Sequence, residues 1–134
     1  MTTLVEARDA LAAFIHTNWT AQYPTTPVYW ENALRVDLDQ VGSMFLRVEI
    51  EFNDALQMTF NDVPIRRTFG ALYLTLFVKD GEGVRAALAC LDYLTNIAKY
   101  QRVGGVILKT PTPGRRTYKD GWRSYELYVP FLFD

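Results

Sequence analysis

Two pairs of carboxylates have a spacing in this sequence that could support chemistry. Glu49 and Glu51 alternate along a predicted strand, so they share one face at a separation of about 7 Å, a distance that glycosidases use. Neither has the apolar or acidic neighbour that general acid catalysis requires, and we expect cross-strand salt bridges with basic residues instead. Asp37 and Asp39 could chelate a cation, but a solvated loop explains two carboxylates without further ligands equally well.

The single histidine and the single cysteine leave little room for nucleophilic or metal chemistry. His16 is the single histidine, and one imidazole excludes most zinc sites and every mechanism that needs two imidazoles. Its place at the end of a predicted helix suits a partner for the helix dipole. Cys90 adjoins the apolar stripe of a second predicted helix, which favours a packed thiol over a nucleophile. Gly104 and Gly105 lack the spacing and the lysine of a phosphate-binding loop. We therefore predict that the chain is not an enzyme and has no metal or cofactor.

Basic and aromatic side chains alternate near the C-terminal end of the sequence. Proteins hold single-stranded nucleic acid with such a combination, but hairpin turn signals in the same segment also fit a solvated arm. The net charge of −1, from 14 basic and 15 acidic residues, argues against duplex nucleic acid as a main partner. We rank docking to an acidic protein first, a solvated arm second and nucleic acid third. The predicted docking set, which we expect at one basic end of the molecule, comprises Arg66, Arg67, Arg115, Arg116, Tyr118, Lys119 and Trp122.

Hydrophobic periodicity predicts the elements that position these residues. Residues 3–16 form an amphipathic helix with Leu4 and Leu11 on its apolar side. Thr3 and Glu6 have the spacing of a capping box at its start. A second helix is predicted over residues 82–100, with an apolar stripe of Val84, Leu88, Leu91, Leu94 and Ala98. Strands are predicted at 28–31, 45–52, 68–79, 106–109 and 122–133.

The predicted elements indicate one α+β domain spanning residues 1–134, because a chain of this length fits a single hydrophobic core. Their order is α-β-β-β-α-β-β, and its simplest arrangement is a two-layer α/β sandwich. This sandwich has a mostly antiparallel sheet of four or five strands, with two helices on one face. Two helices side by side are about 20 Å wide, and a sheet of five strands has about the same width. The two helices can therefore cover only one face of the sheet. We assign to the covered face Leu46, Val48, Ile50, Leu72, Leu74, Leu76, Leu127, Val129 and Phe131.

The opposite face of the predicted sheet is expected to carry Tyr73, Phe77 and Tyr128 among charged residues. The charged residues on this face are Arg47, Glu49 and Glu51. An aromatic patch with a polar rim is typical of a contact surface. The alternative is that the aromatic rings are scattered singly or capped by the predicted loops at 53–65 and 109–122. We favour the contact surface and add the three aromatic residues to the predicted interface.

The order of these features resembles the tail terminator (tail completion) family of long-tailed bacteriophages, over nearly the whole chain. None of the matching segments is a catalytic signature; each is a pattern of packing and turns. They are the opening Thr3-Leu4-Val5-Glu6-Ala7-Arg8, the entry Pro27-Val28-x-Trp30-Glu31-Asn32, Arg66-Arg67-Thr68 with Gly70-x-Leu72-x-Leu74, the predicted helix 82–100, Val103-Gly104-Gly105-Val106, and the ending Gly121-Trp122-x-x-Tyr125-x-Leu127-x-Val129-Pro130-Phe131.

This resemblance implies a structural virion protein that forms a hexameric ring on the tail tube, ends its polymerisation and presents a surface to the head. The implied partners are further copies of the chain, the tail tube protein and head-tail connector proteins. We expect synthesis in the host bacterial cytoplasm and a final place at the head-proximal end of the tail, without membrane or specific nucleic acid binding. No signal peptide pattern opens the sequence, and no apolar stretch approaches the roughly 20 residues that span a membrane. The alternatives are another small head-tail joining protein, or a non-viral binding module that uses the aromatic face.

Overall fold

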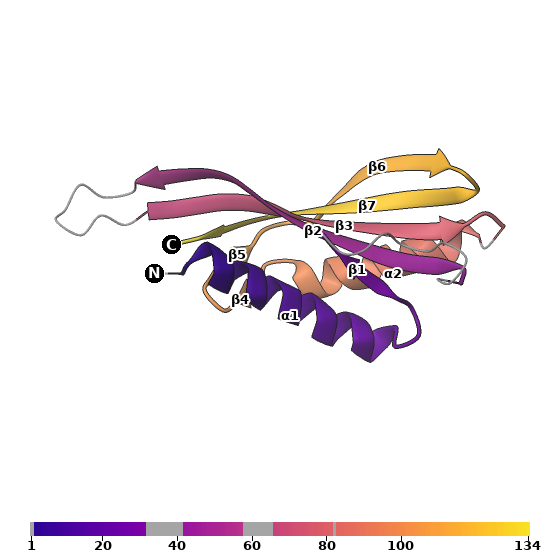
Figure 1. Cartoon of the computed structure of the whole chain (residues 1–134), viewed down its shortest axis with the longest axis horizontal. Helices are drawn as coiled ribbons and strands as arrows, with labels where there is room; N and C mark the ends of the chain where they lie inside the picture. Colours follow the sequence, from indigo (N-terminus) through magenta and orange to yellow (C-terminus); the bar gives the residue numbers. More distant parts are fainter. Residues whose placement is uncertain (1, 32–41, 58–65, 82) are drawn as a thin grey trace.

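The computed structural model describes residues 2–31, 42–57, 66–81 and 83–134 (Figure 1). Two helices and seven strands occur in these ranges. In chain order they are α1 (Leu4–Gln22), β1 (Val28–Trp30), β2 (Met44–Gln57), β3 (Arg66–Lys79), α2 (Val84–Ala98), β4 (Arg102–Val103), β5 (Val106–Leu108), β6 (Thr112–Lys119) and β7 (Trp122–Phe133). The chain therefore has a mixed α and β character, with long strands as its dominant elements.

Three long antiparallel strands, β2, β3 and β7, form the centre of one mixed sheet. The sheet order is β1-β2-β3-β7-β5-β4, and β6 also pairs with β7. One edge of β7 is thus shared by two strands: β6 pairs along its first half and β5 pairs along its last three residues. β1 pairs with β2 in parallel, whereas the other described pairs are antiparallel.

The prediction of a two-layer sandwich with four or five strands is wrong. Among the described residues the sheet has seven strands, and it curls along its length (Figure 1). The two helices do not form an even layer over it, because the α2 backbone approaches β3 and β7 whereas the α1 backbone approaches β4 and β5. The sequence analysis missed β4, which has two residues, and β6, where Pro113 was interpreted as part of a loop. An edge strand tolerates proline because one side of its backbone donates no ladder hydrogen bond.

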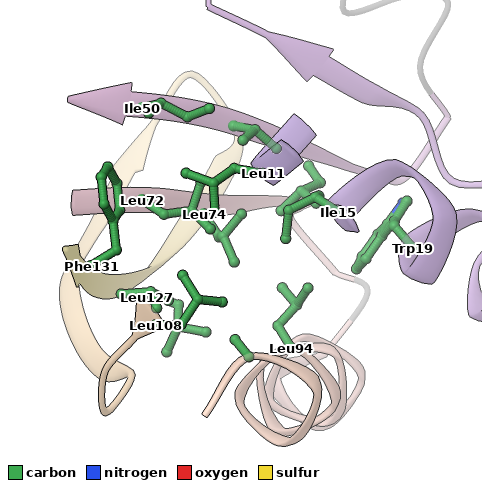
Figure 2. Close-up of a cluster of buried hydrophobic side chains, with 14 of the residues drawn as sticks. Leu11, Ile15, Trp19, Ile50, Leu72, Leu74, Leu94, Leu108, Leu127 and Phe131 are labelled. Atoms are coloured by element: carbon green, nitrogen blue, oxygen red, sulfur yellow. The ribbon is translucent and has the colours of Figure 1, made fainter. Parts of the chain in front are cut away.

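Side chains of both helices and of the central strands enter one hydrophobic core (Figure 2). All nine aliphatic and aromatic residues that were assigned to the covered face are buried there, which confirms that assignment. Helix α1 contributes Ala7, Leu11, Ile15 and Trp19, at a spacing of four residues, and α2 contributes Ala87, Cys90, Leu94 and Ala98. The predicted stripes were partly wrong, since Leu4, Val84 and Leu88 are 46%, 42% and 39% exposed.

The start of α1 follows the predicted capping box. The Glu6 amide donates to the Thr3 hydroxyl at 3.1 Å, and the Thr3 amide donates to the Glu6 carboxylate at 2.8 Å. The helix runs to Gln22, six residues beyond its predicted end. His16 therefore lies within the helix, exposed, and not at its C-terminus as predicted.

Candidate interaction surface

The sheet face that points away from the core, here called the outer face, carries a second apolar cluster. In this aromatic cluster the ring of Phe45 stacks on Phe77 with centroids 4.7 Å apart and meets Trp122 and Tyr29 edge-on at 5.3 and 5.5 Å. Phe45 is 4% exposed and Trp122 is 9% exposed, although neither helix contributes a buried residue to the cluster. Among the described residues, the rings shelter one another through stacked and edge-to-face contacts.

The middle of the outer face is mixed, with paired charges beside aromatic rings. Arg47 forms an ion pair with Glu49 at 3.0 Å and lies over the Phe77 ring at 5.4 Å. The predicted basic partner of Glu49 is thus present, but it lies on the same strand and not across the sheet. Both side chains are 46% exposed, so the pair adds little stability. Its effect is to place fixed charges beside the ring of Phe77.

Tyr73 and Tyr128 stand directly opposite each other on β3 and β7, with ring centroids 5.4 Å apart. Both are half-buried on the outer face, as predicted. Burial raises the pKa of the Tyr73 hydroxyl, and the charge of Glu51 raises it further. A side-chain hydrogen bond from this hydroxyl to Glu51 raises the pKa as well. Neither tyrosine belongs to the two hydrophobic clusters found among the described residues.

The β6–β7 hairpin carries most of the predicted docking set. All eight residues of β6 are exposed, and a tight turn with positive φ at Asp120 and Gly121 joins it to β7. Arg116 lies over the ring of Tyr125 at 5.2 Å, and Arg123 lies over Tyr118 at 5.5 Å. Each of these rings therefore has a cation fixed above it.

Several members of the set are held by neighbouring groups, and others are open. The Tyr118 hydroxyl donates to Asp80 at 3.3 Å. Arg115 and Lys119 are exposed. Trp122, by contrast, lies inside the aromatic cluster, where its role is packing.

Arg66 and Arg67 do not join this hairpin. They begin β3, next to the end of β7 at Phe133, whereas Lys119 pairs with Trp122 at the opposite end of the ladder. The structure therefore shows no single basic end of the kind that was predicted from the sequence. Arg67 donates twice to the Asp134 carboxylate, at 2.7 and 3.1 Å, and this contact holds the pKa of Asp134 below its usual value. Arg66 is exposed and lines a shallow pocket under the β2–β3 hairpin.

The sequence analysis missed two residues of the aromatic cluster, Tyr29 and Phe45. Phe45 precedes Leu46 on the same strand, so strict alternation of side chains could have placed it on the outer face. Tyr29 gave no comparable signal, because a strand of three residues shows no clear alternation. The exposed edge of β6 was missed together with the strand itself.

The structure assembles no obvious catalytic centre in the described ranges. No group of three or more possible metal ligands occurs there, and Asp37 and Asp39 lie outside the described residues. Cys90 is buried, with its thiol 3.9 Å from the sulfur of Met44, and burial raises the pKa of that thiol. Neither α1 nor α2 is long and apolar enough to cross a membrane.

Comparison with known proteins gives information about the fold and none about the function. No protein-family model matches the chain, and no curated protein is similar to it in sequence. Among solved structures, one chain aligns over 95% of both chains, with 17% sequence identity and a TM-score of 0.68. At this identity the likeness shows that the fold occurs in another protein of similar length, and it indicates no activity or partner.

Proposed function

We propose that this chain is a structural subunit of a phage tail, which closes a ring on the head-proximal end of the tail tube. The ring ends tube polymerisation and presents the surface to which the head attaches. Its partners are further copies of the chain, the tube protein and head-tail connector proteins. The resemblance of the sequence to tail terminators suggests this role, and the outer face of the sheet is the observation that carries it.

The outer face has the composition of a contact surface. Tyr73, Phe77 and Tyr128 are half-buried in the isolated chain, beside the charged Arg47 and Glu49. Rigid aromatic side chains with a polar rim bind protein partners well, because they bury a large area while losing little side-chain entropy. A second protein laid on this face would remove the remaining exposed ring area from water.

The two ends of the β2–β3–β7 ladder supply distinct surfaces for the two sides of a ring. The paired ends of β2 and β3 project beyond the helices at one end, and the β6–β7 hairpin forms the other end (Figure 1). A ring that halts polymerisation needs one axial side that binds the last tube subunit and another that does not bind the next. The β2–β3 strand pair and the β6–β7 hairpin differ in sequence and in length, which meets this requirement.

The proposal is tested by adding the purified chain to polymerising tail tube protein from the same phage and measuring tube lengths in negative-stain images. We expect short tubes with a ring at one end. Tyr73→Ser combined with Tyr128→Ser is expected to lose this effect, whereas Tyr100→Ser, at a tyrosine that is 72% exposed outside the outer face, is expected to keep it.

Three outcomes separate the alternatives. Unchanged tube lengths, with rings that bind connector proteins, would indicate another head-tail joining protein. A monomer that forms no ring alone or with tube protein, and that binds a peptide or small ligand on the outer face, would indicate a binding module. Normal capping by the double tyrosine variant would remove the outer face from the mechanism.

A further inference from the structure

Two of the longer strands, β6 and β2, have open edges in the part of the chain that the structure describes. β6 pairs with β7 on one side, and no described strand pairs with its other side. β1 covers β2 only along residues 46–48, so no described strand pairs with the outer edge of β2 beyond Ile50. A row of unpaired backbone donors and acceptors is a template for pairing with another chain. These edges lie on opposite margins of the sheet and toward opposite ends of the ladder.

The two open edges carry opposite charges. β6 has Arg115, Arg116 and Lys119 and contains no acidic residue. The far part of β2, residues 51–56, has Glu51 and Asp54 and contains no basic residue. Like charges that face each other across a strand pair are destabilising, whereas opposite charges stabilise it. Pairing of β6 with a second β6, or of β2 with a second β2, is therefore disfavoured.

We infer that β6 of one copy pairs with the far part of β2 in the next copy, so that neighbouring subunits share a continuous sheet. This inference deepens the proposed function and rests on it for the identity of the partner as a second copy. Two different surfaces meet in such a contact, which makes it head-to-tail. Head-to-tail contacts generate closed rings, or filaments where the rotation does not close. Strand pairing thus supplies the lateral contact that a capping ring needs.

The direction of the strands is compatible with this contact. β6 is antiparallel to β7, β7 to β3 and β3 to β2, so β6 is antiparallel to β2 within one subunit. A neighbour in a similar orientation therefore presents β2 antiparallel to β6. Pro113 and the irregular register between residues 113 and 116 end regular pairing in the first half of β6. The segment that remains for the neighbour is 115–119.

The contact also requires a shift along the strands. Lys119 is level with Lys79 through Trp122, whereas Asp54 is level with Phe69. Lys79 and Phe69 are ten residues apart, which corresponds to about 33 Å of strand. A ring can absorb such a stagger when its strands incline to the ring axis, as strands do in a closed barrel. Inclined strands are therefore a further property of the ring that this contact predicts.

Zero-length carbodiimide cross-linking tests which residues meet. By strand register Lys119 and Asp54 both belong to the outer face, and in one subunit they lie toward opposite ends of the ladder, so a bond between them must join two copies. The full chain is mixed as unlabelled and ¹⁵N-labelled protein, cross-linked at high concentration and digested for mass spectrometry. We expect a mixed-isotope Lys119–Asp54 peptide pair. Rings or oligomers that form without this cross-link would overturn the inference and leave the proposed function standing.

A charge exchange tests whether the contact drives association. Lys119→Glu or Asp54→Lys alone is expected to weaken association by about fivefold at low salt, because each places like charges opposite one another. The chain with both substitutions is expected to return to within about twofold of the original affinity. Arg102→Glu and Asp92→Lys, which change exposed charges away from both edges, serve as matched controls.

Association is measured by sedimentation equilibrium over a range of concentrations. If the double variant is as weak as the singles, or if the chain stays monomeric at every concentration, strand pairing between copies is wrong. The tube-length assay on the unmodified chain decides the proposed function separately, so the two failures are distinguishable. Lost association in the double variant combined with normal capping by the unmodified chain would place the lateral contact elsewhere.

Discussion

The two faces of the β2–β3–β7 ladder are built from alternate residues of the same strands, yet they are buried in different ways. On the core face, Leu72, Leu74 and Leu76 are fully buried beneath elements from elsewhere in the chain. On the outer face, Tyr73 and Phe77 are half-buried and rely on neighbouring rings. The core face is covered by other elements of the same chain, whereas the outer face keeps exposed ring area that the proposed assembly would bury. In that proposal, folding and assembly use opposite sides of a single sheet.

The largest effect in this comparison is expected on the core face. Leu74→Ala removes a fully buried side chain, which we expect to lower the free energy of unfolding by about 3 kcal/mol. Tyr73→Ala, one residue earlier on the outer face, is expected to lower it by only about 1 kcal/mol. Urea denaturation of both variants measures the two values. Equal losses would mean that the outer face is as important for folding as the core, and the comparison of faces would break.

A second, smaller effect concerns the packing of β3 against its neighbours on the core side. A Cβ at position 70 would lie 2.5 Å from the ring carbon Cζ of Phe131 and would also meet the backbone carbonyl of Glu51. We therefore expect Gly70→Ala to destabilise the fold by about 2 kcal/mol. Gly105→Ala is the control, because its nearest neighbour is the side chain of Thr2, which can turn away. Thermal unfolding of the two variants should differ clearly, and a tolerated Gly70→Ala would show that Phe131 has room to move.

Much of this division between faces could be predicted from the sequence. Strict alternation in residues 45–52, 68–79 and 122–133 identified the core side, and the same alternation placed Tyr73, Phe77 and Tyr128 on the other side. Alternation reports the local environment of a strand, and it works wherever one face is buried. It contains no information about how many strands join the sheet, which is why the predicted sandwich of four or five strands was wrong.

The missed features of the surface have a different cause. β6 is exposed on both faces, so its side chains show no apolar alternation, and Pro113 with Gly114 gave it the composition of a loop. The predicted basic end joined Arg66 and Arg67 to the β6–β7 hairpin because both segments are basic. Only the strand register separates them, since β3 begins where β7 ends. Register between distant strands depends on long-range pairing that a single sequence does not display.

The β6–β7 hairpin sharpens the comparison because its exposed charges are proposed to act in assembly and are expected to contribute little to folding. Charge reversal by Arg115→Glu with Arg116→Glu is expected to abolish ring formation and tube capping, while the free energy of unfolding falls by under about 1 kcal/mol. That small loss comes from the contact of Arg116 with the Tyr125 ring. Sizing with light scattering and circular dichroism on the same samples measures both properties. Full assembly by the folded double variant would remove both arginines from the interface.

The smallest effect is expected at the opposite end of the ladder, where Arg67 holds Asp134 across exposed surface. The hydrogen bonds from Arg67 keep the pKa of the Asp134 carboxyl below its ordinary value of 3.8, so ionised Asp134 favours the folded state. This contribution is present above pH 3.8 and is lost as the pH falls through the lower pKa of the folded chain. Asp134→Asn should therefore melt at a slightly lower temperature than the original chain at pH 7 and at the same temperature near pH 2. A difference that persists at low pH would show that Asp134 stabilises this end by packing and not by its charge.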